Sequence, residues 1–381
     1  MSSPVLNQAA RVLKLVQTGT PADQALRESL TQNRHFTDPA GRRAVSHAVF
    51  VYFRWWRWLD ANDSLQKQAE AALALQDRFD RNPASIKPEA LAALAVPDWL
   101  KAEMDLPVET LRQFQRDPAL WIRARAASAE SVAQRLGHCL PAANSLLPAP
   151  DSLLSAFRYG GTKDLYRTPE FQGGEFEIQD LASQLVGHAC APRPGETWWD
   201  ACAGEGGKTM HLSDLMQGKG MLWASDRSAR RLAKLKERAA RAKVFNYRAA
   251  EWDGGAKLPT KTKFDGILVD APCSGVGTWQ RNPHARWTTT PDDVRELAAV
   301  QINLLNHVAG SLKPGGRLVY SVCTLTRAET AAIADAFTAT HPDFEPCPVF
   351  SAQSSALDSQ LFLRPEALNA NGMFIAAWRK R

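Results

Sequence analysis

Apolar residues recur at helical spacing through the first part of the chain. Val5, Ala9 and Val12 stand three or four positions apart, and a longer apolar series runs over residues 43–59. Residues at this spacing line one face of a helix, which is buried against its neighbours. The pattern predicts a helical domain over residues 1–85.

The longer series ends in the letters FRWWRWLD, which place Arg54 and Arg57 among three tryptophans. Tryptophan rings stack on unpaired bases and arginines pair with phosphates, so one interpretation is contact with RNA. The other is an aromatic helix face buried in a core, with the arginines at its edge. We favour the buried interpretation for the tryptophans.

The pattern changes after the prolines at positions 83, 88 and 97. ALWIRARA, residues 119–126, alternates apolar and basic positions as a half-buried strand does. SAESVAQRLG then predicts a short helix that ends at Gly137. We expect a small α+β module over residues 86–178.

From residue 179 onward, strand-like runs alternate with helical stretches. The runs are TWWDACAG, GMLWASD, FDGILVDAP and GGRLVYSVCT. This alternation predicts an α/β domain over residues 179–381, with a mostly parallel, doubly wound sheet.

Composition narrows the function classes. The chain of 381 residues carries a formal net charge of +6, and a mild basic excess suits a nucleic-acid partner. It has no apolar run of about 18 residues, the length that a membrane span needs, and its first residues lack the pattern of a signal peptide. We therefore expect a cytoplasmic protein.

The chain has six cysteines, and no two of them form a C-x-x-C pair: Cys139, Cys190, Cys202, Cys273, Cys323 and Cys347. The spacing argues against a zinc site, and the expected compartment argues against a disulfide framework. We expect no metal, and each cysteine has to be interpreted separately.

The run DACAGEGGKT, residues 200–209, is a glycine-rich turn between a strand and a helix. A P-loop would need glycine in place of Cys202, and a dinucleotide fingerprint would need a smaller residue than Thr209. Glycines still let the backbone approach a ligand at the carboxyl end of a strand. Asp226, at the end of the next strand, is placed to bond both hydroxyls of a ribose, and Asp253 follows the third strand, where it is placed to bind an adenine amino group. Without a pyrophosphate motif, this set indicates S-adenosylmethionine.

Two features of this region have a structural alternative. Asp226 taken alone is equally well explained as a turn or capping residue. Residues 227–243 contain eight basic residues and one acidic residue, which form either a phosphate-facing stripe or a solvated helix face. We favour the solvated face.

Two cysteines follow adjacent predicted strands. Cys273 lies in DAPCSGVG and Cys323 lies in YSVCTL, 50 residues later. A single cysteine on a strand is usually a small buried residue. Two of them at neighbouring strand ends, beside a cofactor loop, indicate a function instead.

Methylation at carbon 5 of cytosine explains a need for thiols. Carbon 5 is a poor nucleophile until a thiolate adds to carbon 6, which makes carbon 5 an enamine carbon. Asp270, at the end of the strand before Cys273, is placed to bond ring nitrogen N3 and supply a proton. The second cysteine, or a base near it, would then remove the proton from carbon 5. The chemistry alone allows either cysteine to be the nucleophile.

These segments together resemble the Sun/Nop family of RNA cytosine-5 methyltransferases. DACAGEGGKT, DAPCSGVG followed by RNPHARW, and YSVCTL occur in the order and spacing of that family. GEFEIQDLASQL resembles the entry to its catalytic domain, and LRPEALNANGMFIAAW resembles its closing segment. The resemblance covers residues 96–381.

The resemblance implies a class I S-adenosylmethionine-dependent methyltransferase fold, preceded by a small RNA-recognition-like module. It implies that Cys323 attacks the base, that Cys273 assists product release, and that Lys208 positions Asp270. Cofactor contacts are expected from Cys202, Ala203, Gly204, Glu205, Gly206, Gly207, Lys208, Asp226, Arg231, Asp253 and Asp270.

The loop after Cys273 departs from the family pattern R-R-x-P-x-x-K-W. Gln280 replaces an arginine and Arg286 replaces the lysine. By the resemblance, Arg281 and Arg286 face RNA or the active site, so the departures would alter substrate contacts.

The resemblance makes RNA the expected partner of what we expect to be a monomer. Residues 1–85 faintly resemble the NusB-like helical domain of the bacterial ribosomal RNA member, but this match does not fix the substrate. A ribosomal RNA cytosine is the first choice and transfer RNA the second. Two other functions stay open: an amino-group RNA methyltransferase, and a non-catalytic RNA-binding or assembly protein on a methyltransferase fold.

Overall fold

The computed structural model describes residues 3–32, 38–142, 155–350 and 358–381. The chain divides into two compact units: Met1–Pro118 with Thr278–Thr289, and Ala119–Gly277 with Thr290–Arg381. Within the described ranges, no helix combines the length and apolar character that crossing a bilayer requires. The domain boundaries expected at residues 85 and 178 stay a prediction of the sequence.

The first unit is built from helices. They are α1 (Ser3–Gln17), α2 (Ala22–Gln32), α3 (Pro39–Trp55), α4 (Leu65–Arg81), α5 (Pro88–Leu94), α6 (Val108–Phe114) and α12 (Ala285–Thr288). The predicted apolar face of α1 is buried, with Val5, Ala9 and Val12 in one core with α2, α3 and α4. The Asp38 carboxylate begins α3 by accepting a 2.7 Å hydrogen bond from the Gly41 N–H, which satisfies an otherwise unpaired backbone donor.

The arginine and tryptophan cluster at the end of α3 lies partly in the core and partly at the surface. Trp55 is fully buried, and Arg54, 1% exposed, donates to Asp117 at 2.7 Å and to Gln76 at 2.9 Å. The buried interpretation is therefore confirmed for Trp55. Trp56 remains 45% exposed.

The second unit contains a four-stranded antiparallel sheet in the order β2-β3-β1-β4. Its elements are β1 (Leu120–Ala124), α7 (Ala129–Leu136), β2 (Cys139–Pro141), β3 (Ala156–Tyr159), α8 (Pro169–Gln172) and β4 (Phe176–Ile178). The predicted strand at ALWIRARA and the predicted helix after it are both confirmed. The helix ends at Gly137, whose positive φ of 69° suits glycine.

The larger sheet has the strand order β10-β12-β9-β8-β5-β6-β7, and β11 pairs with β12. Its strands are β5 (Thr197–Asp200), β6 (Met221–Asp226), β7 (Tyr247–Glu251), β8 (Phe264–Asp270), β9 (Leu312–Val322), β10 (Phe344–Pro346), β11 (Gln360–Leu363) and β12 (Met373–Lys380). The run from β9 to β7 is parallel and β12 is antiparallel to β9. The predicted mostly parallel sheet is confirmed.

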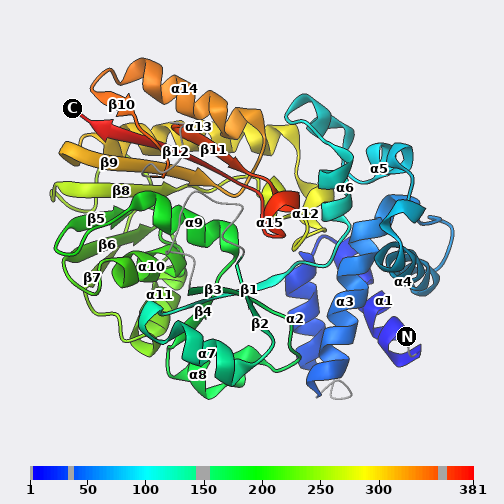
Figure 1. The fold of residues 1–381 in the computed structure, drawn as a ribbon. Helices are drawn as coiled ribbons and strands as arrows, with labels where there is room; N and C mark the ends of the chain where they lie inside the picture. Colours follow the sequence, from blue (N-terminus) through cyan, green and yellow to red (C-terminus); the bar gives the residue numbers. More distant parts are fainter. Residues whose placement is uncertain (1–2, 33–37, 143–154, 351–357) are drawn as a thin grey trace. The chain divides into compact units, whose positions relative to one another are not determined.

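Helices cover both faces of this sheet (Figure 1), as a doubly wound fold requires. They are α9 (Leu181–Cys190), α10 (Gly207–Leu215), α11 (Ala229–Arg241), α13 (Pro291–Ala309), α14 (Ala331–Thr340) and α15 (Pro365–Leu368). Neighbouring residues of β5 show the alternation of faces. Trp198 packs in the core with α9 and α10, and Trp199 packs in the core with α13 and α14.

The carboxyl ends of the parallel strands meet at one edge of the sheet. Asp200, Asp226 and Asp270 each end a strand there, and Cys323 follows β9. In open α/β sheets this edge is where ligands bind. The topology therefore assembles residues that are far apart in the sequence.

Candidate functional site

Cys273 and Cys323 meet at the carboxyl edge of the sheet. Their Sγ atoms are 3.4 Å apart, although 50 residues separate them in the chain. β8 and β9 are neighbouring parallel strands, and each cysteine lies in the turn that follows one of them. The pair predicted from the sequence is thus brought together.

Asp270 lies beside this pair between two donors. Its Oδ2 is 2.7 Å from the Lys208 ammonium, and its Oδ1 accepts a 2.7 Å hydrogen bond from the Ser321 hydroxyl. Lys208 is in the first turn of α10, directly after the glycine-rich loop. The contact between Lys208 and Asp270 was expected from the family resemblance, whereas Ser321 was not predicted to be part of the site.

The surroundings of Cys273 and Lys208 at this edge of the sheet shift their pKa values for different reasons. The pKa of Cys273 is raised well above the usual range, first by its hydrogen bond with Cys323 and then by burial. Burial alone would lower the pKa of Lys208, but Asp270, with Cys323 and Asp200, raises it overall. Lys208 therefore stays a cation near the cysteine pair.

The glycine-rich loop is shaped by its glycines. Gly204 and Gly206 have positive φ values of 55° and 84°, which residues with a Cβ adopt at a cost. A Cβ on Gly204 would lie 2.4 Å from the Arg231 guanidinium, and one on Gly206 would lie 2.6 Å from Leu235. A side chain at Gly206 would therefore displace the buried Leu235, and one at Gly204 would displace the Arg231 guanidinium from the loop.

Asp226 holds this loop from the end of β6. Its Oδ2 accepts from the Gly204 N–H at 2.9 Å and lies 3.4 Å from Arg231, while its Oδ1 accepts from the Ser228 N–H at 2.9 Å. The bond from the Ser228 N–H is the contact expected of a turn or capping residue, so Asp226 has this structural role as well. Its carboxylate oxygens have further lone pairs that a ribose hydroxyl can use.

The other expected cofactor residues differ in exposure. Cys202, Ala203 and Gly207 line the loop and are partly or fully buried, whereas Glu205 is exposed. Asp253 is exposed after β7, and its Oδ1 accepts a 2.8 Å bond from the Gly255 N–H. Its contact with an adenine amino group stays a prediction.

Asp200 was not predicted as a site residue, although it begins the DACAGEGGKT motif. It is fully buried at the end of β5, where burial above all raises its pKa to about 7. Its Oδ2 accepts a 2.7 Å bond from the Thr209 hydroxyl, while its Oδ1 is buried without a partner. An unpaired buried carboxyl oxygen is costly unless a ligand satisfies it.

The donor set of this loop fits S-adenosylmethionine. The free Oδ1 of Asp200 suits the ammonium of an amino acid, and Asp226 suits a ribose. The described residues contain no cluster of metal-binding side chains.

The loop after Cys273 corrects one expectation. Arg286 was expected to face RNA or the active site, but its side chain is fully buried. It donates to Ala95 O at 2.8 Å, to Phe114 O at 2.8 Å and to Gln115 Oε1 at 3.3 Å. Burial lowers its pKa to about 9. The expectation for Arg286 is wrong because carbonyls of the helical unit bind this cation inside the core.

Gln280 and Arg281, in the same loop, differ in exposure. Gln280, which replaces an expected arginine, is buried and donates to Asp117 O at 3.0 Å. Arg281 is exposed, so its role toward RNA stays a prediction.

The basic helix α11 is only partly a free surface. Arg238 and Arg241 both pair with Glu177 of β4, the former at 2.9 Å, so these two cations help to attach the helix to the smaller sheet. Arg227 and Arg230 are exposed. The solvated interpretation fits these exposed positions.

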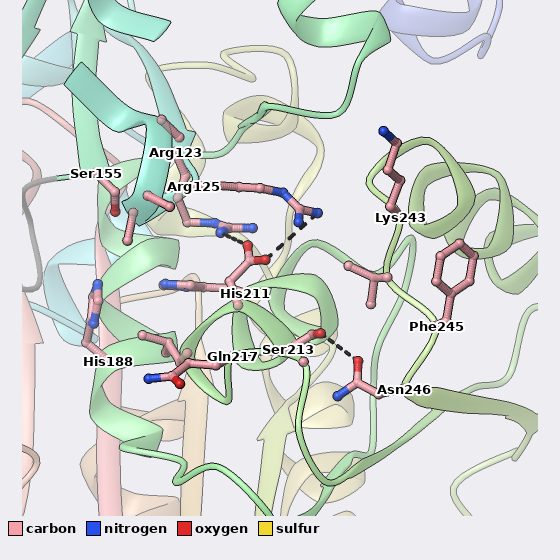
Figure 2. Close-up of a pocket in the computed structure, with 17 residues that line it drawn as sticks. Arg123, Arg125, Ser155, His188, His211, Ser213, Gln217, Lys243, Phe245 and Asn246 are labelled. Atoms are coloured by element: carbon pink, nitrogen blue, oxygen red, sulfur yellow. Dashed lines mark hydrogen bonds and ion pairs between the residues drawn. The ribbon is translucent and has the colours of Figure 1, made fainter. Parts of the chain in front are cut away.

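A cavity of about 880 Å³ (Figure 2) has neither Cys273 nor Cys323 in its lining. It opens between β1, the end of α10 and the segment before β7, and its lining includes Arg125, His188, His211, Lys243 and Phe245. It is therefore at the amino-terminal edge of the strands. Ligands of open α/β sheets bind at the carboxyl edge, so geometry and chemistry place the candidate site at the cysteines rather than in this cavity.

The chain is similar to several known proteins. A family model described as 16S rRNA methyltransferase RsmB/F matches residues 188–379. The chain is 38% identical over 219 residues to "Probable ribosomal RNA small subunit methyltransferase B" of Bacillus subtilis, covering 55% of this chain and 49% of that protein. It is 35% identical over 304 residues to the protein of the same name from Synechocystis, covering 77% of this chain and 66% of that protein. The chain thus spans about half to two thirds of the length of these relatives.

A solved structure of a protein named PH0851 has a similar fold. It superposes with a TM-score of 0.80 at 21% identity, over 100% of this chain and 99% of that one. Together with the family match, this likeness shows that the larger sheet and its helices form a class I methyltransferase fold.

Proposed function

Because the chain belongs to the 16S rRNA methyltransferase RsmB/F family, we propose that it transfers a methyl group from S-adenosylmethionine to carbon 5 of a cytosine in ribosomal RNA. The observation that carries the proposal is the pair of thiols, with Sγ atoms 3.4 Å apart, beside the Lys208–Asp270 ion pair. Methylation of an exocyclic nitrogen needs no thiol, so this pair favours carbon 5 over an amino group as the target.

Cys323 begins the reaction as a thiolate that attacks carbon 6 of the base. The new S–C bond turns carbon 5 into a nucleophilic enamine carbon. S-adenosylmethionine, when bound, supplies the methyl group. The Lys208 ammonium near Cys323 stabilises the negative charge of the attacking sulfur.

Asp270 orients the cytosine. Both groups that contact its carboxyl, Lys208 and Ser321, are donors, so the Asp270 oxygens accept and suit the exocyclic amino group of the base. Ring nitrogen N3 takes up a proton when the sulfur adds to carbon 6. That proton would come from the Lys208 ammonium by way of Asp270, since these two groups are 2.7 Å apart.

Cys273 completes the reaction at carbon 5. Removal of the carbon 5 proton regenerates the double bond between carbons 5 and 6 as the bond to Cys323 breaks and its thiolate leaves. In this step the Cys273 thiolate accepts the proton, and its position next to Cys323, after a neighbouring strand, supports the role. The target base has to be unpaired or flipped out to reach both sulfurs.

Cysteine variants test the proposal. Cys323→Ala should abolish methylation, and Cys273→Ala should accumulate a covalent protein–RNA adduct that survives denaturing electrophoresis. Cys139→Ala, a partly exposed cysteine on β2, is the matched control and should retain activity. Full methylation by Cys323→Ala would end the proposal.

The target RNA needs a separate experiment. Bisulfite sequencing of total RNA from cells with and without the gene should show one protected cytosine of small-subunit ribosomal RNA that depends on the gene. A gene-dependent site in transfer RNA would replace the ribosomal substrate, and the absence of any such site would favour a non-catalytic assembly role.

A further inference from the structure

Glu329 is a fully buried carboxylate behind the cysteine pair. It ends the short 3-10 helix η9 (Arg327–Glu329), which follows β9. Its Oε1 accepts from the Ser274 N–H at 2.8 Å and from Gln301 Nε2 at 3.0 Å, and its Oε2 accepts from the hydroxyls of Ser274 and Thr326. These four donors are neutral, so they satisfy the carboxylate without cancelling its charge.

The bonds of Glu329 extend to both cysteine loops. Ser274, which follows Cys273, makes two of them, and its hydroxyl is 3.0 Å from the hydroxyl of Thr324, which follows Cys323. On the other side of Cys273, the Gln301 amide that binds Glu329 also donates to Pro272 O at 2.9 Å. A single side chain therefore connects the residues on both sides of Cys273 with the residue after Cys323.

The backbone of Glu329 adds a contact to β9 itself. The Tyr320 hydroxyl lies 2.6 Å from Glu329 O and 2.9 Å from Gln301 Oε1, and its single hydrogen is shared between these two acceptors. Tyr320 is fully buried three positions before Cys323. Glu329 is thus also hydrogen-bonded to β9, the strand that precedes Cys323.

Charge is distributed unequally around the two sulfurs. Cys273 faces Cys323, Glu329 and the Tyr320 hydroxyl, and Glu329 adds to the rise in the pKa of Cys273 that hydrogen bonding with Cys323 and burial begin. The Gly275 N–H opposes that rise. Cys323 instead interacts with the Lys208 cation, whose charge Asp270 partly balances.

We propose that Glu329 is a positioning residue that holds the two cysteine loops together and keeps the negative charge of the pair on Cys323. The inference rests on the proposed function, in which Cys323 has to attack first. It also explains the order of the two roles. Once Cys323 is bonded to carbon its sulfur is neutral, so the strongest opposition to ionising Cys273 is gone when the carbon 5 proton has to leave.

Alkylation of the thiols tests this inference without RNA or cofactor. The protein is treated briefly with limiting iodoacetamide over a range of pH, and modification of Cys273 and Cys323 is quantified separately by peptide mass spectrometry. In the native protein Cys323 should react faster than Cys273 near neutral pH. Glu329→Gln should raise the initial rate at Cys273 about fivefold and change that at Cys323 less than about twofold, because removing a nearby buried charge shifts a proton equilibrium by up to about tenfold.

Two further variants complete the experiment. Asp265→Asn, which removes a carboxylate at the opposite end of β8, is the matched control and should leave both rates unchanged. Glu329→Asp withdraws the charge by one methylene, should raise the Cys273 rate about twofold, and carries the test if the glutamine variant does not fold.

The inference is overturned if Cys273 reacts faster than Cys323 in the native protein, or if the folded Glu329 variants leave the Cys273 rate unchanged. Because the readout is thiol reactivity, it is independent of methylation. Absence of methylation with the expected rates would remove the proposed function alone, and methylation with unchanged rates would remove the role of Glu329 alone.

Discussion

Asp200→Asn is the substitution that best separates the stability of this fold from its function. The wild-type carboxyl is buried at the end of β5 with Oδ2 bonded to Thr209 and Oδ1 without a partner. We expect the variant to be more stable than the wild type above neutral pH and to bind the cofactor less well.

The pH dependence follows from the pKa of Asp200, which burial, with Asp270 and Asp226, raises from 3.8 to about 7 against the opposing effects of Thr209 and Lys208. A raised pKa means that the folded state holds a proton that the unfolded chain has already released. The stability from this group is complete below the unfolded pKa and is lost as pH rises to the folded one, at about 1.4 kcal/mol per pH unit. Over the whole interval the loss amounts to about 4 kcal/mol.

An asparagine at this position stays neutral at every pH, so the variant does not lose this stability as the pH rises. Its amide N–H₂ would take the place of Oδ1 and would have no hydrogen-bond acceptor, which lowers the free energy of unfolding by about 1–3 kcal/mol at every pH. Between pH 5 and pH 7 the free energy of unfolding of the variant should therefore rise relative to that of the wild type by about 2 kcal/mol, whatever the constant cost is.

Urea unfolding of both proteins without cofactor, at several pH values, measures this difference. Asp265→Asn is a control with the opposite sign, since the pKa of Asp265 is lowered by Lys313 and the Thr197 N–H against a rise from burial. Calorimetric titration with S-adenosylmethionine should show affinity about 10- to 100-fold lower for Asp200→Asn, the value of one charge-assisted hydrogen bond. A difference in stability that stays flat with pH would refute the reasoning about burial, and unchanged affinity would refute the contact with the ammonium.

Two further predictions concern the glycine-rich loop and the loop after Cys273. Asp226→Ala should weaken S-adenosylmethionine binding at least about tenfold in the same calorimetric assay, because a ribose partner and the bond to the Gly204 N–H are both lost; equal affinity would remove Asp226 from the cofactor site. Arg286→Ala should lower the free energy of unfolding by about 3–5 kcal/mol, since it leaves buried oxygens without a donor. Arg281→Ala, at an exposed position in the same loop, should stay within about 0.5 kcal/mol of the wild type, and equal losses in both variants would contradict the burial argument.

The larger sheet could be predicted from the sequence because its strands end in recognisable residues. Runs such as FDGILVD are too apolar for a surface, and each ends in an acid or a cysteine where the chain leaves the core. Parallel pairing then places these ends at one edge. The proximity of Cys273 and Cys323 is a consequence of that topology and needs no knowledge of side-chain packing.

Residues whose role depends on partners from distant segments could not be predicted. Glu329 lies in TRAET, a polar stretch that resembles an exposed helix start, and only the folded chain brings Ser274 and Gln301 to it. In the sequence, Asp200 is only the first residue of the motif DACAGEGGKT. Its unpaired oxygen becomes visible only when the burial of both carboxyl oxygens is known.

The loop after Cys273 shows why a departure from a family pattern is ambiguous until the structure is known. Gln280 and Arg286 differ from the family pattern, and a solvated loop would make these differences a matter of substrate contact. Both side chains are instead buried against residues 95–117 of the helical unit, where Arg286 binds two backbone carbonyls and Gln280 binds a third. A lysine carries a single ammonium group, whereas the guanidinium has several donors in a fixed plane. The arginine at position 286 is therefore explained by the carbonyls it binds, and the substrate contact expected of the exposed Arg281 stays a prediction.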